Sequence, residues 1–174
     1  MDNNIKLLAI QKDLLSTDEK VVLKALKEVS KHGNPTIMPA LLKATFLNGS
    51  QDVLKAGKFI LYNLKDNNCV DFLFEALNDE RYMEFHNTIA ASIWEAGLKV
   101  DDRLLDLVEL AVRLDYVTAI EISTIIENIE TGFPYEEVTD ASLTINEYVE
   151  DSTDENKNSL LISLAETLNG MVAG

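Results

Sequence analysis

The sequence of 174 residues predicts an all-α fold, an α-solenoid of about four antiparallel helix pairs with a capping helix at each end. Apolar residues recur with a period of about 3.6 along most segments, and none alternates with the period of two that a strand requires. Helix pairs are expected to begin near residues 17, 51, 82 and 115. Repetition at such intervals is typical of stacked helix pairs, which cannot bury their apolar faces alone.

Short motifs mark where the first helices begin and end. Ser16 and Glu19 have the spacing of a capping box, so a helix is expected to begin there, after an opening helix over residues 3–15. Gly33 suits the left-handed position that follows a helix. The Asn-Pro pair directly after it then begins the next helix.

The same succession of caps, apolar stripes and polar breaks continues to the end of the chain. Ser50 can cap one helix, and Gly97 can end another that begins near Tyr82. Asp101 and Asp102 are expected in the first turn of the next helix, where the helix dipole favours acids. The whole chain, residues 1–174, is predicted to be one domain with repeats at residues 17–49, 50–80, 81–114 and 115–151 and capping helices at residues 3–15 and 153–169.

Individual letters repeat as well. Val-Leu-Lys-Ala at residues 22–25 returns at residues 53–56. Together with residues 33–42, which begin Gly-Asn-Pro, and residues 70–79, which end in an acidic turn, this pattern resembles the short HEAT-like helical repeats. The resemblance implies a right-handed superhelix in which the second helix of each pair lines a concave face. Some HEAT-like proteins are DNA glycosylases or phycobilin lyases, but the glycosylases need a basic groove that this acidic chain does not offer.

The charge of the chain is large and unevenly distributed. The net charge is −15, and a chain with so few clustered cations is not expected to bind nucleic acid directly. Residues 1–65 hold ten Lys against six acids, whereas residues 66–174 hold five Lys or Arg against 24 acids. No Lys or Arg occurs from Leu114 to Asn156. This asymmetry favours binding of a basic partner by the second half.

No motif with catalytic chemistry is found. The two histidines, His32 and His86, lie in different repeats, and Cys69 has no histidine near it in sequence. The paired acids have neither calcium-loop spacing nor nearby metal-ligating His or Cys. We therefore expect no catalytic, cofactor-binding or metal-binding residue. The aromatic residues fall on helical faces and are predicted to belong to the core, among them Trp94, Phe59 and Phe85.

The lone cysteine, the absence of a signal-peptide pattern and the absence of a long apolar stretch predict a cytoplasmic protein that does not enter a membrane. Its predicted function is that of a non-enzymatic adaptor or scaffold whose acidic concave face binds another protein with a basic surface. The predicted contact residues are the acids on the second helices of three repeats: Asp71, Glu75, Asp102, Asp106, Glu109, Glu136, Asp140 and Glu147.

Three alternatives remain open at this stage. The acids could form only a solubilising surface, the chain could be an enzyme or lyase-type subunit whose site carries no motif, or it could be an acidic inhibitor that imitates phosphate. The net charge favours a monomer. A weak head-to-tail association remains open, in which acids near residues 115–155 of one copy meet the lysine stripe of another, Lys20, Lys24, Lys27 and Lys31.

Overall fold

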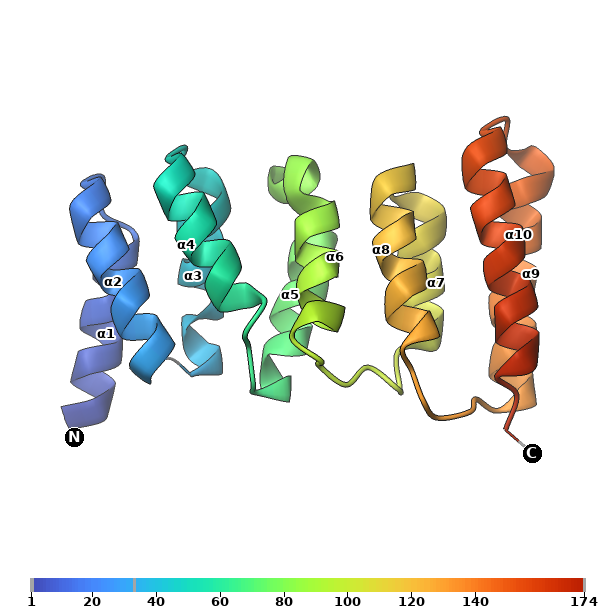
Figure 1. The fold of residues 1–174 in the computed structure, drawn as a ribbon, viewed down its shortest axis with the longest axis horizontal. Coiled ribbons are helices and arrows are strands. Elements are labelled where there is room, and N and C mark those ends of the chain that lie inside the picture. The colour runs from blue at the N-terminus through green and yellow to red at the C-terminus, as the bar shows by residue number, and fades with distance from the viewer. Residues whose placement is uncertain (1, 33, 174) are drawn as a thin grey trace. The chain divides into compact units, whose positions relative to one another are not determined.

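The computed structural model describes residues 2–32 and 34–173, which form ten α-helices and no strand, and this confirms the predicted all-α class (Figure 1). Short 3-10 turns precede α3, α5 and α6. The single β-bridge within the described ranges joins Phe133 to Val172. Gly33, the predicted left-handed residue, lies outside the described residues.

Contacts divide the chain into two compact units, Met1–Leu98 and Lys99–Gly174. The prediction of a single continuous domain over residues 1–174 stays a prediction. The helices of the first unit are α1 (Asp2–Leu14), α2 (Glu19–His32), α3 (Met38–Leu47), α4 (Gln51–Leu61), α5 (Val70–Leu77) and α6 (His86–Glu95). Those of the second are α7 (Leu104–Arg113), α8 (Tyr116–Glu127), α9 (Tyr135–Asp151) and α10 (Glu155–Gly170).

In the first unit each odd-numbered helix packs mainly against the helix that follows it, so that α1 pairs with α2, α3 with α4 and α5 with α6. The odd-numbered helices also contact one another in order, as do the even-numbered helices, which gives two layers (Figure 1). The sequence predicted α2 with α3 and α4 with α5. The observed pairing is shifted by one helix because α1 buries Leu7, Ile10 and Leu14 and is a full partner of α2.

The second unit repeats this arrangement. α7 pairs with α8 and α9 with α10, while α7 also packs along α9 and α8 along α10. Buried aliphatic residues fill the space between them, with Leu107, Ile122, Ile145 and Leu161 fully buried. Phe133 holds the segment that follows α10, because its backbone N–H donates to Met171 O at 2.8 Å and its carbonyl accepts from Ala173 N–H at 2.8 Å.

Two of the predicted helix boundaries are confirmed. The Ser50 hydroxyl accepts a hydrogen bond from Val53 N–H at 3.3 Å and caps α4. Gly97 follows α6 with φ +65°, the left-handed conformation that glycine adopts without strain.

Three predicted helix starts are wrong. α2 is capped by Asp18, whose carboxylate accepts from Lys20 N–H at 2.9 Å, while Ser16 only supports the preceding turn by accepting from Asp18 N–H. α7 begins at Leu104, so Asp101 and Asp102 lie in the turn before it. The segment Glu80–Phe85 is a 3-10 turn, and α6 begins only after it. At two of these boundaries another polar side chain accepts the free backbone N–H groups, Asp18 before α2 and Asp79 before the 3-10 turn. The start of α7 has no side-chain cap.

The prediction for the aromatic core is wrong at three positions, since Tyr116 and Tyr135 are exposed as well as Phe59. Phe85 stacks on Phe46, with ring centroids 4.9 Å apart, and Trp94 is half-buried. Phe59 on α4 is 68% exposed, because it lies on the outer side of that helix with Lys55 and Asn63 rather than on its buried stripe.

Candidate functional site

All eight predicted contact residues are exposed, but they lie on two compact units. Asp71 and Glu75 lie on α5 of the first unit. The other six belong to the second unit, where Asp102 precedes α7 and the rest lie on α7 and α9: Asp106, Glu109, Glu136, Asp140 and Glu147. The structure thus brings these six acids together on two adjacent helices and the turn before α7. We call this surface the α7–α9 acidic face.

The packing of α7 against α9 explains why these acids face solvent. The buried stripes of the two helices contain Leu107 and Ala111 on α7 and Ala141 and Ile145 on α9. On an α-helix, residues three or four positions apart share a face, so the acids at 106 and 109 form one outer stripe and those at 136, 140 and 147 form another.

Arg103 compensates part of this charge. Its guanidinium lies 3.4 Å from Asp106 and 4.0 Å from Asp102. Within the described part of the chain, the other four acids of the face have no salt bridge: Glu109, Glu136, Asp140 and Glu147. The uncompensated charge is therefore concentrated on α9 and the middle of α7.

A second cation of this unit, Lys157, is withdrawn from the surface. Its side chain is 4% exposed, and its ammonium group donates hydrogen bonds of 2.6 Å to the carbonyl oxygens of Val112 and Leu114. The ammonium group also lies 4.6 Å from the ring centroid of Tyr148. Lys157 consequently satisfies the carboxyl end of α7 and compensates no surface acid.

Sequence reasoning missed the role of Lys157, although a signal was present. Lys157 occupies the first position of a stripe that continues with Leu161, Leu164 and Leu168, all of which are buried. A lysine in register with an apolar stripe is expected to bury its stem and to seek acceptors for its ammonium group.

The acids of α5 have a different environment. Glu75 lines a cavity of about 230 Å³ between α3 and α5, together with Lys43 and Arg81. Arg81 Nε lies 3.0 and 2.9 Å from the two carboxylate oxygens of Asp79, and its hydrogen bonds lower the pKa of that carboxyl. This surface of the first unit therefore carries both signs of charge.

The remaining reactive side chains of the first unit have structural surroundings. His86 is buried, with Nε2 3.2 Å from Asp79 O. Burial raises the pKa of the Cys69 thiol to about 11, with a smaller contribution from the negative charge of Asp66. The side chain of His32 lies outside the described residues. Among the described residues, no three His, Cys, Asp or Glu side chains are placed to hold a metal ion.

No protein-family model matches the chain, and comparison with curated proteins and with solved structures gives no match either. None of the helices in the described part of the chain combines the length and apolarity needed to cross a membrane.

Proposed function

We propose that the chain is a short HEAT-like repeat protein that acts as a non-enzymatic adaptor or scaffold, binding a basic protein through the α7–α9 acidic face. The pairing of successive helices within each unit supports the HEAT-like assignment, which rests on the sequence resemblance. One observation carries the functional part of the proposal. Four exposed acids on adjacent helices have no salt bridge within the described residues, while Lys157 is buried.

Charge arithmetic explains why such a face would select a basic partner. Residues 99–174 hold 17 acids against four Lys or Arg, and one of those four is Lys157. A surface of one sign attracts a partner of the opposite sign over about 10 Å at 0.1 M salt and accelerates the encounter. Charges at the rim of an interface act mainly on the association rate and on partner choice.

Two variants of equal charge separate a specific face from a general acidic effect. The first reverses the four uncompensated acids to Lys: Glu109, Glu136, Asp140 and Glu147. The control reverses four other exposed acids of the same unit to Lys: Glu127, Glu130, Glu155 and Glu166. Partners of the wild-type chain are identified by cross-linking in native extract, purified, and titrated against each variant.

We expect the first variant to lose the purified partner and the control to retain it. Equal retention by both would make the acids a solubilising surface, and equal loss in both would make binding a consequence of net charge alone. A partner that binds nucleic acid through the same contacts would favour the inhibitor alternative. Catalytic turnover that survives in the first variant would favour the enzyme or lyase-type subunit.

A further inference from the structure

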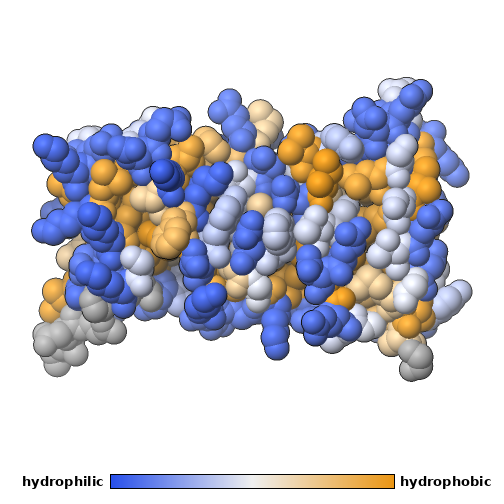
Figure 2. All heavy atoms as spheres, viewed as in Figure 1, coloured by the Kyte–Doolittle hydropathy of each residue, from blue (hydrophilic) through white to orange (hydrophobic). Residues whose placement is uncertain are grey.

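A groove lies between the carboxyl-terminal halves of α2 and α4 in the first unit. Its volume is about 380 Å³, within the range of about 300–1,000 Å³ that is usual for ligand pockets. Its lining is mostly apolar and includes Val29, Ile37, Met38, Phe59, Ile60 and Leu64. Apolar residues reach the surface between α2 and α4, with hydrophilic side chains on both sides (Figure 2).

Phe59 gives the groove an exposed aromatic wall. Its side chain is 68% exposed, although it belongs to a well-packed helix whose inner stripe, Val53 and Leu61, is fully buried. Single exposed apolar residues need no explanation, but a large aromatic side chain beside an apolar groove forms a continuous apolar surface. Aromatic side chains that border a pocket are typical anchors of protein interfaces.

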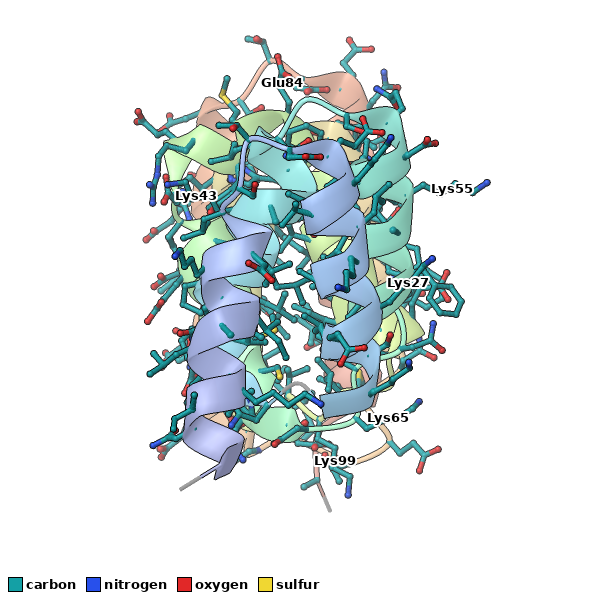
Figure 3. The ribbon with its side chains drawn as sticks, turned by 90° about the vertical axis from the view of Figure 1, so that its left-hand side faces the viewer. Lys27, Lys43, Lys55, Lys65, Glu84 and Lys99 are labelled. Atoms are coloured by element: carbon teal, nitrogen blue, oxygen red, sulfur yellow. The ribbon has the colours of Figure 1, made fainter. Side chains whose placement is uncertain are left out.

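The carboxyl-terminal halves of α2 and α4 carry lysines, and another lysine follows α4. They are Lys27, Lys31, Lys58 and Lys65, and Lys65 lines the groove itself. Lys27, Lys55 and Lys65 extend from one side of the unit, whereas Lys43 extends from the opposite side (Figure 3).

Two acids near the groove already have partners. Glu28 lies 3.5 Å from Lys6 and 3.8 Å from Lys31, and the carboxylate of Asp66 accepts from the backbone and side chain of Asn68. Within the described residues no salt bridge involves two of the flanking lysines, Lys27 and Lys65. These ammonium groups are available to an anionic ligand.

We infer that the α2–α4 groove binds an acidic peptide segment of another protein, which inserts apolar side chains beside Phe59 and places its carboxylates against the flanking lysines. An amphipathic helix in a groove is a common mode of peptide recognition, with anchors at helical spacing. The inference concerns the first unit and does not depend on the proposed α7–α9 face. Both sites together would let the chain bridge one basic and one acidic partner.

The groove favours a peptide over the other anionic ligands. Nucleic acid is held by phosphate contacts and gains little from a mostly apolar pocket, and the net charge of −15 opposes a polyanion of high charge density. An anionic membrane is usually engaged by protruding apolar side chains, whereas here the apolar surface is hollowed. A short peptide responds mainly to the lysines within about 10 Å at 0.1 M salt.

Fluorescence anisotropy with labelled peptides tests the inference. The acidic probe is a peptide of about 15 residues with Leu and Phe anchors at helical spacing and Glu elsewhere. A second probe keeps the anchors and replaces Glu by Lys, and a third scrambles the acidic sequence. We expect the acidic probe to bind at least about tenfold more tightly than either, a difference of about 1.4 kcal/mol.

The protein variants locate the binding. Phe59→Ser and the double variant Lys27→Glu/Lys65→Glu should each weaken binding of the acidic probe about tenfold. Lys43→Glu is the matched control because it reverses an exposed lysine on the opposite side of the same unit, and it should leave the affinity within about twofold. Reversal of the four uncompensated acids of the α7–α9 face should not weaken binding of this probe, so the two proposals can fail separately.

Equal binding of all three peptides, or equal weakening by Lys43→Glu, would overturn the inference. So would a groove-dependent preference for anionic vesicles, for single-stranded nucleic acid or for a second copy of the chain.

Discussion

The ammonium group of Lys157 donates a 2.6 Å hydrogen bond to the carbonyl oxygen of Leu114 and joins the start of α10 to the end of α7. A second bond of the same length reaches Val112 O. A cation at the carboxyl end of a helix also interacts favourably with the helix dipole. Lys157 therefore ties together two helices that are far apart in sequence.

Replacing Lys157 by Met should destabilise the second unit by about 2–4 kcal/mol. Methionine keeps an apolar stem but leaves the two carbonyl groups without their donor. Urea unfolding followed by circular dichroism measures the loss, with Lys55→Met on an exposed face as the control. Equal stability of both variants would mean that the contact contributes little to folding.

The same residue shows how far the sequence predicts this structure. The all-α class follows from the 3.6-residue period, and Ser50 and Gly97 mark helix ends because each has one dominant local role. The pairing register was not predictable from periodicity alone, since α1 has the same apolar spacing whether it caps a stack or fills a pair. Long-range contacts such as Lys157 with Leu114 depend on tertiary packing and have no local pattern.

The site was predictable in part for a related reason. Exposure of seven of the eight acids follows from their places on polar helix stripes, whereas Asp102 lies in the turn before α7. Which of these negative charges are compensated by a cation does not follow from the helix stripes. Arg103 reaches Asp106 only because it lies in the turn before α7. The lysine-flanked groove was also not predicted, since Phe59 was assigned to the core.

Ile125→Asp should destabilise the second unit by several kcal/mol. Ile125 is 2% exposed on α8, so the variant would bury a carboxylate without a partner. Ile120→Asp is the matched control on the same helix, because Ile120 is 37% exposed and the new carboxylate could reach water. Thermal unfolding of both variants checks the prediction, which fails if Ile125→Asp keeps wild-type stability.

Gly57→Ala should destabilise the first unit by about 1–3 kcal/mol. A β-carbon at Gly57 would overlap the hydroxyl and methyl groups of Thr45, so α3 and α4 would have to move apart. Thr45→Ala removes those two groups and should restore part of the loss in the double variant. Additive effects of the two substitutions in chemical denaturation would contradict this close contact.

Asp115→Ala should cost about 1 kcal/mol at neutral pH, because Asp115 caps α8. Partial burial acts to raise the pKa of this carboxyl, but hydrogen bonds from the hydroxyl and backbone N–H of Thr118 outweigh it and lower the pKa below its usual value. The carboxylate thus contributes stability above its unfolded pKa of about 4, and this contribution is lost as the pH falls through the lower folded pKa.

Denaturation at several pH values checks this linkage. The difference between wild type and Asp115→Ala should shrink as the solution becomes strongly acidic, whereas Asp115→Asn, which keeps a capping oxygen, should retain most of the stability at neutral pH. A difference that is constant from neutral to strongly acidic pH would show that the charge of Asp115 has no part in it.

The uneven charge also predicts how the chain behaves at high concentration. Residues 1–65 carry a net charge of +4 and residues 66–174 a net charge of −19, so copies could attract one another head to tail at low salt. The total charge of −15 opposes this contact, and at about 0.15 M salt screening over about 8 Å weakens the attraction. We therefore expect a monomer at physiological salt in sedimentation experiments, with association confined to low salt.

Because head-to-tail contacts do not close in general, such association should give open, concentration-dependent oligomers. A defined dimer that persists in high salt would contradict this expectation, and loss of low-salt association after reversal of Lys20 and Lys24 would identify the lysine stripe as its basis.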